Sequence, residues 1–348
     1  MPRMAVVLAA IGISASVSFA QPASSGPYRI LRTAKAGGTG GFDYVFADAV
    51  GRRLYIPRSG QGARVTVFNL DTLEPVGEIP NTNARGATVD PKSGHGFSSS
   101  KPVAMWDTKT LAVLKTIDVQ GNPDGILFDP FNQRVWVFSH SAPNATIIDA
   151  RDGSVVGTLD LGGAPEQAVT DGNGHIYVDI EDKDNVAVVD TRALQVTAHY
   201  DISEKAKVPA GLAFDARNKI LFVGCRNTPT MVIMTTEGKI LTALPIGAGV
   251  DGAVFNPATM ESFSSQGDGT LTVIKEKSPT SFEVVQTVQT KVSGKTLTLD
   301  SKTNQIYVIA AEYGPPPTPP PAGGRAGRAG RGAMIPDSFS ILVLGNKQ

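Results

Sequence analysis

One acidic or amide residue recurs along the chain at a nearly constant interval, and this repeat limits the possible folds more than any other feature. The seven positions are Asp48, Asp90, Asp129, Asp171, Asp215, Asn256 and Asp300, at spacings of 42, 39, 42, 44, 41 and 44 residues. Each is followed by a short turn and an apolar run such as Val135-Trp136-Val137. Runs rich in β-branched and aromatic residues are typical of strands. The chain is therefore predicted to hold seven copies of one strand-based unit.

The third copy shows the unit clearly. Residues 125–129, 135–139, 145–149 and 155–159 are predicted strands, separated by turn residues such as those at 130–133. Four short antiparallel strands repeated at this period are the sequence signature of a β-propeller. We predict an all-β, seven-bladed β-propeller of four-stranded antiparallel blades. A residue that recurs in every blade serves the repeat, so the seven Asp and Asn side chains are expected to bind backbone N–H groups in the turns.

The last repeat has only three strands, the third of which is residues 339–344. The missing strand is found near the other end of the chain, where residues 30–34 resemble the outer strand at 113–117. We predict that the N-terminal strand completes the C-terminal blade and closes the ring, which hides strand edges that invite aggregation.

The first 20 residues have the pattern of a secretory signal peptide. Arg3 precedes an apolar run, and Ser18-Phe19-Ala20 is a small-x-small cleavage site. The run is shorter than the ~20 apolar residues that span a bilayer, and no membrane span is expected. These features predict bacterial export to the periplasm or medium, with residues 21–348 as a single domain. The single cysteine, Cys225, is expected to be a buried filler.

Residues 314–336 interrupt the last blade with a run of prolines, followed by Gly and Ala with Arg325, Arg328 and Arg331. This low-complexity loop is predicted to lie between the second and third strands. It is either a tolerated insertion, or a lid or small basic patch for an anionic partner. Nucleic acid binding has weak support, because the net charge is zero and no broad basic surface with aromatics is evident.

The strand phrases at 185–191 and 306–308, with Gly and Pro turns such as the one at 121–125, resemble the YVTN repeat. The chain resembles YncE-like seven-bladed propellers over nearly the whole sequence after residue 20. WD40 repeats fit less well, because Trp106-Asp107 is the only Trp-Asp pair. The resemblance implies an exported or surface binding scaffold and supplies no set of catalytic residues.

In a propeller, the loop before each innermost strand and the loop between the second and third strands lie on one face. Charged residues at both kinds of position are therefore predicted to surround one mouth of the central channel. The first kind gives Asp43, Arg85, Asp124, Glu166, Asp251 and Lys295. The second kind gives Arg58, His140, Glu181, Asp182, Arg226 and Glu312. We take these twelve as candidate ligand-binding residues, with a solvated rim of mutually paired charges as the alternative.

Carboxylates at Asp43, Asp124, Glu166 and Asp251 make Ca²⁺ possible, since Ca²⁺ prefers oxygen ligands. No other cofactor is predicted, and the four histidines are too scattered to indicate zinc. His140 is a weak candidate for a catalytic base or metal ligand.

Two functions follow from this sequence. The first is a non-catalytic scaffold, expected to be monomeric, that binds a small molecule, a peptide or an envelope protein at the channel mouth. The alternative is a lactonase-like hydrolase or lyase that uses the rim carboxylates with a divalent metal or His140.

Overall fold

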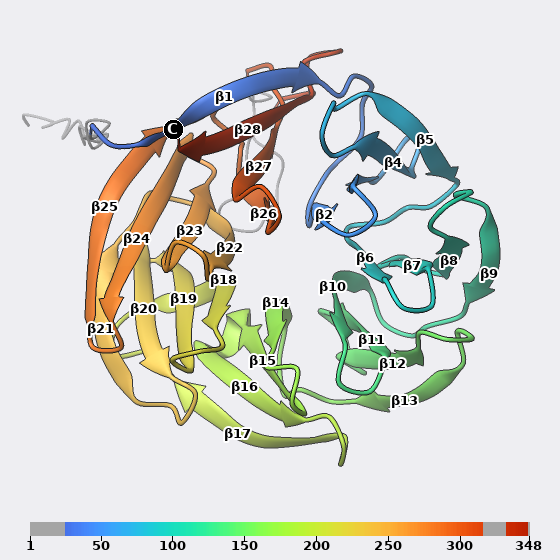
Figure 1. Ribbon diagram of the computed structural model, residues 1–348. Helices are drawn as coiled ribbons and strands as arrows, with labels where there is room; N and C mark the ends of the chain where they lie inside the picture. Colours follow the sequence, from blue (N-terminus) through green and yellow to red (C-terminus); the bar gives the residue numbers. More distant parts are fainter. Residues whose placement is uncertain (1–24, 316–331, 347–348) are drawn as a thin grey trace, which may run out of the picture.

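The computed structural model describes residues 25–315 and 332–346, and in these residues seven four-stranded antiparallel sheets surround a central axis (Figure 1). The predicted all-β, seven-bladed propeller is confirmed. The helical structure within the described ranges is a single 3₁₀ turn, η1 (Glu181–Lys183). It follows that none of the described helices could cross a membrane. The predicted signal peptide and Arg325, Arg328 and Arg331 lie outside the described residues.

Each blade runs from an innermost strand at the axis to an outer strand at the circumference. The innermost strands are β2 (Phe46–Asp48), β6 (Ala87–Asp90), β10 (Pro123–Asp129), β14 (Pro165–Thr170), β18 (Lys207–Asp215), β22 (Val250–Asn256) and β26 (Thr296–Asp300). The second strands are β3 (Arg53–Arg58), β7 (His95–Ser98), β11 (Arg134–Ser139), β15 (His175–Ile180), β19 (Ile220–Asn227), β23 (Glu261–Gln266) and β27 (Gln305–Ala310).

The outer half of each blade completes the sheet. The third strands are β4 (Arg64–Asn69), β8 (Val103–Asp107), β12 (Ala145–Asp149), β16 (Asn185–Asp190), β20 (Thr230–Thr235), β24 (Thr270–Ser278) and β28 (Ser340–Asn346). The outer strands of blades 1 to 6 are β5 (Pro75–Pro80), β9 (Val113–Ile117), β13 (Val155–Leu159), β17 (Gln195–Asp201), β21 (Ile240–Pro245) and β25 (Ser281–Gln289). Blade 7 takes its outer strand from the other end of the described chain, β1 (Tyr28–Lys35).

The strand β1 pairs antiparallel with β28, so that blade 7 contains both ends of the propeller (Figure 1). Tyr28 also ties this strand to blade 6. Its backbone N–H donates to Gln286 Oε1 at 2.9 Å, and Gln286 Nε2 donates back to its carbonyl at 2.8 Å. The Tyr28 hydroxyl donates to Glu261 Oε2 at 2.5 Å. The first strand thus bridges two blades and closes the ring.

The seven repeated Asp and Asn side chains organise the turns after the innermost strands, as predicted. In every copy the side-chain oxygen accepts the backbone N–H of the residue two positions on, at distances from 2.7 to 3.2 Å. Such local bonds satisfy turn donors that no strand partner can reach. The repeat is therefore structural.

The hydrophobic core is divided among seven clusters, each of which joins two neighbouring blades. In one cluster, for example, Tyr55 and Val67 of blade 1 pack with Val89 and Trp106 of blade 2. Successive strand residues point to opposite faces of a sheet, and both faces are buried against other blades. This explains why the strands read as continuous apolar runs rather than as alternating patterns.

The described residues of the insertion in blade 7 lie between β27 and β28. Its described ends face each other, since Tyr313 and Met334 form an isolated antiparallel bridge. The N–H of Gly314 donates to the carbonyl of Ala333 at 2.9 Å. Residues 316–331, which carry most of the predicted loop, lie outside the described residues.

Candidate ligand site at the channel mouth

Eight of the predicted residues form a closed ring in which acidic and basic side chains alternate. In order around the channel the ring reads Asp43, Arg85, Asp124, His140, Glu166, Arg226, Asp251 and Lys295. All seven blades contribute to the ring. Each member lies just before or near the start of an innermost strand, or close to the end of a second strand. Blade 5 has Ala210 where other blades carry a charge, and Arg226 from its second strand takes that place.

The first half of the ring is centred on Asp124. Arg85 Nη1 lies 3.3 Å from Asp124 Oδ1 and 4.0 Å from Asp43 Oδ2. On the other side, His140 Nε2 lies 3.0 Å from Asp124 Oδ2 and 3.6 Å from Glu166 Oε1. Asp124 therefore contacts a base with each of its two oxygens.

The second half is centred on Arg226. Its Nη1 lies 2.7 Å from Glu181 Oε1 and 3.8 Å from Glu166 Oε1, and its Nη2 contacts Asp251. Lys295 Nζ contacts Asp251 and lies 3.1 Å from Asp43 Oδ1, which completes the circle. Glu181 is thus a ninth predicted residue at the same mouth. The charges pair with one another, as the rim alternative expects, and they also enclose a cavity.

Burial raises the pKa of two acids of the ring, Asp124 and Glu166. Asp124 is 3% exposed and Glu166 is 7% exposed. Burial raises the pKa of Asp124, with a further contribution from repulsion by Asp43, and Arg85 opposes the shift. Burial also raises the pKa of Glu166 well above its usual range, against the attraction of Arg226. Carboxyl groups whose pKa is raised by burial and by nearby charges are concentrated in functional sites.

The ring encloses a cavity of about 720 Å³ at the channel mouth. Phe42 and Tyr313 supply aromatic wall, and Asn122 and Asp268 supply further polar groups. A second cavity of about 260 Å³ lies along the channel, and Glu166 and Asp251 line both cavities.

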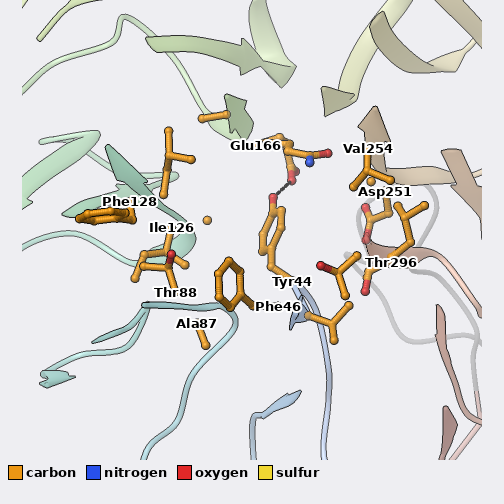
Figure 2. Close-up of a pocket in the computed structure, with 18 of the residues that line it drawn as sticks. Tyr44, Phe46, Ala87, Thr88, Ile126, Phe128, Glu166, Asp251, Val254 and Thr296 are labelled. Carbon is orange, nitrogen blue, oxygen red and sulfur yellow. Dashed lines mark hydrogen bonds between the residues drawn. The ribbon is translucent and has the colours of Figure 1, made fainter. Parts of the chain in front are cut away.

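The wall of the smaller cavity is largely apolar. Phe46, Ile126 and Phe128 lie on one side of it and Val254 on the other, while Tyr44 points across it toward Glu166 (Figure 2). The mouth therefore combines a charged outer cavity with an apolar inner one.

Four predicted residues line neither cavity: Arg58, Asp124, Asp182 and Glu312. Asp124 nevertheless belongs to the ring through its contacts with Arg85 and His140. Arg58 is fully buried, donates to the carbonyls of Gly37 and Thr39 at 2.9 and 3.1 Å, and lies with its guanidinium carbon 3.6 Å from the centre of the Phe339 ring. Burial lowers the pKa of Arg58 to about 10. Its position indicates a structural role beneath the loop at 37–40.

Asp182 and Glu312 are exposed near the rim. Asp182 accepts the N–H of Ala164 at 2.7 Å, and Glu312 lies 3.7 Å from Lys291. The structure thus places neither side chain in the cavity wall.

Sequence reasoning missed Tyr44, Phe42, Asn122 and Tyr313, because it searched for charged residues alone. Tyr44 and Phe42 flank Asp43, and Asn122 lies two residues before Asp124. These three residues could have been predicted as neighbours of the repeated charged position. Cys225 is buried, as predicted, and burial raises the pKa of its thiol. A thiol in that state is a poor nucleophile.

No protein-family model and no curated protein matches the chain. Among solved structures, the chain is similar to one described as the crystal structure of RRP9 WD40 repeats, with a TM-score of 0.73 and 11% sequence identity. The similarity covers 93% of this chain and 99% of the other. At this identity the likeness shows the shared propeller fold alone.

Proposed function

We propose that this protein is an exported binding scaffold of the YncE-like kind that takes a small polar ligand into the cavity at the channel mouth. The observation that carries the proposal is the ring of alternating charges around a cavity of about 720 Å³. Small-molecule sites have volumes of roughly 300–1,000 Å³ and combine apolar walls with a few converging polar groups. The signal-like first 20 residues support export.

The arrangement of charges favours a ligand that carries both signs. Arg85, Arg226 and Lys295 offer cationic donors within a few ångströms of the carboxylates of Asp43 and Asp251. A ligand with an ammonium and a carboxylate can replace one of these contacts with each of its groups, so the protein charges stay paired on binding. Amino acids and peptides of two or three residues have this chemistry, and the volume suits them better than a folded protein partner.

A thermal-shift and calorimetric screen tests the proposal, because a ligand that binds only the folded state raises its melting temperature. The panel contains amino acids, dipeptides, tripeptides, sugar lactones and short oligonucleotides. We expect a shift from a zwitterion that is lost in Arg226→Gln and kept in Arg151→Gln, whose arginine is on the exposed surface beside Asp149. A panel without any response, or equal responses in both variants, would contradict the proposal.

The group around His140 favours a second function, the lactonase-like hydrolase. His140 lies beside Asp124 and Glu166, and the raised pKa of Glu166 suits a group that exchanges a proton with a ligand. Water would add across the lactone ester bond and release a hydroxy acid. Acid release from sugar lactones, followed with a pH indicator in the presence of divalent ions, should then depend on His140 and be lost in His140→Gln.

A further inference from the structure

We propose that Asp124, His140 and Glu166 bind one divalent transition-metal ion at the edge of the mouth cavity. One potential ligand atom from each residue lies within 4.8 Å of the other two, so a single ion can contact all three. The site goes beyond the binding of an organic ligand and does not depend on it.

The two carboxylates are already oriented for this role. Arg85 Nη1 donates to Asp124 Oδ1 at 3.3 Å, and the Tyr44 hydroxyl donates to Glu166 Oε2 at 2.9 Å. Each acid therefore has one oxygen held by an outer partner and directs the other, Oδ2 or Oε1, toward His140 Nε2. Outer partners that fix a ligand's free atom in this way are a regular feature of metal sites.

The imidazole nitrogen at the centre of the trio needs a partner. His140 Nε2 is inaccessible to solvent and makes no hydrogen bond, although it lies 3.0 Å from Asp124 Oδ2. Buried polar atoms are nearly always satisfied, since leaving one unpaired is costly. A bound cation would contact this nitrogen together with the two carboxylate oxygens that face it.

The charge of the mouth also favours a cation. Six carboxylates stand in the cavity wall or the ring against three permanent bases, which leaves an excess of three negative charges when all six are ionised. The acids are Asp43, Asp124, Glu166, Glu181, Asp251 and Asp268, and the bases are Arg85, Arg226 and Lys295. An ion at the trio would offset the repulsion between two buried acids.

The donor set selects the class of metal. One imidazole nitrogen and two carboxylate oxygens suit first-row divalent ions such as Zn²⁺, Co²⁺ or Mn²⁺, with ligand distances of about 2.0–2.2 Å. Ca²⁺ prefers six to eight oxygens, so the trio is a poor match to it. His140 and Glu166 line the cavity, and the remaining coordination positions would therefore face a ligand or water.

Titration with Co²⁺ tests the site, because its visible absorption reports nitrogen and oxygen ligation directly. The purified chain, freed of any affinity tag and of organic ligands, should bind one Co²⁺, and Zn²⁺ should displace it. Affinity should fall at least tenfold in His140→Gln. The control is His175→Gln. His175 also lies beside a carboxylate, with its Nδ1 2.9 Å from Asp171 Oδ2, but it is at the start of a second strand, whereas His140 follows the end of one.

The proposal is overturned if Co²⁺ gives no absorption change, or if His140→Gln binds it as tightly as His175→Gln does. Circular dichroism melting of each variant shows whether the fold is intact, and Glu166→Gln provides a second variant. A zinc anomalous peak between the three side chains would support the site, and a peak elsewhere would contradict it. Since no organic ligand is present, these outcomes are separate from the small-ligand screen.

Discussion

The hydroxyl of Tyr44 donates to Oε2 of Glu166 at 2.9 Å, although the two residues are 122 positions apart in the chain and belong to blades 1 and 4 (Figure 2). This bond crosses the channel and connects the residue after Asp43 with a member of the charged ring. It also fixes which oxygen of Glu166 remains for His140. A residue outside the charged pattern thus sets the orientation of one inside it.

Replacement of Tyr44 by Phe should cost about 1–2 kcal/mol of unfolding free energy, because Glu166 Oε2 loses a donor in a buried site. Urea denaturation measures the change. The matched control is Tyr200→Phe, since the Tyr200 hydroxyl donates to the carbonyl of Thr236 at 2.9 Å on outer strand β17. A smaller loss of unfolding free energy in Tyr44→Phe than in Tyr200→Phe would show that the bond across the channel stabilises the fold no more than a bond on an outer strand does.

Replacement of Arg226 by Met should cost about 2–4 kcal/mol near pH 8, since Glu166, Glu181 and Asp251 lose a shared cation. Arg226 lowers the pKa of Glu166 against burial, and its removal lets that pKa rise further. A carboxyl group whose pKa is raised on folding stabilises most fully at low pH, and this contribution is lost as pH rises. The cost should therefore shrink toward about pH 5.

Denaturation at both pH values provides the measurement for Arg226→Met. Arg151→Met is the control, because Arg151 pairs with Asp149 on the exposed surface and its loss should change little. A cost that is independent of pH would show that the ring carboxylates do not titrate with folding.

Replacement of Asp179 by Asn should stabilise the fold increasingly as pH rises. Asp179 is fully buried on β15, neither carboxyl oxygen has a hydrogen-bond partner, and burial raises its pKa well above the usual range. Unfolding releases its proton above about pH 4, so the wild type loses up to ~1.4 kcal/mol of stability per pH unit until the folded pKa is reached. The amide has no such slope.

Unfolding free energies of Asp179→Asn and wild type, measured from about pH 4 to about pH 8, provide the comparison. If the unfolding free energies of the two proteins have the same pH dependence, the pKa of Asp179 is not raised by folding.

Loss of the strand that closes the ring should be severe. Deletion of residues 28–35 removes β1 and should abolish cooperative unfolding, because blade 7 then exposes the edge of β28. The point variant Gln286→Ala should cost about 1–3 kcal/mol, since it leaves the backbone N–H and carbonyl of Tyr28 without their partners. Gln195→Ala, at an exposed position of outer strand β17, should be nearly neutral. Comparable losses in the two point variants would contradict the proposed clamp.

The blades could be predicted from the repeat because every copy has the same pattern of strands and turns. The predicted strand bounds of blade 3 agree with the structure except at two strand starts. β10 begins at Pro123, two residues earlier than expected, and β11 begins at Arg134, one residue earlier. The mouth residues were predictable as a group, since a residue at a fixed distance before each Asp or Asn must lie near the axis. Arg58 could not be distinguished from Arg226 in the sequence, because both lie at the end of a second strand and only packing decides which of them is buried.

The amino-acid sequence by itself determined the number of blades, the four-stranded unit and the face on which charged residues gather, because these depend on periodicity and local turn chemistry. Tertiary structure alone decided the alternation of acids and bases around the mouth, the bond from Tyr44 to Glu166, and the meeting of His140 with Asp124 and Glu166. Those contacts join blades that are remote in sequence, and their geometry is set only when the ring closes and every blade takes its angle about the axis.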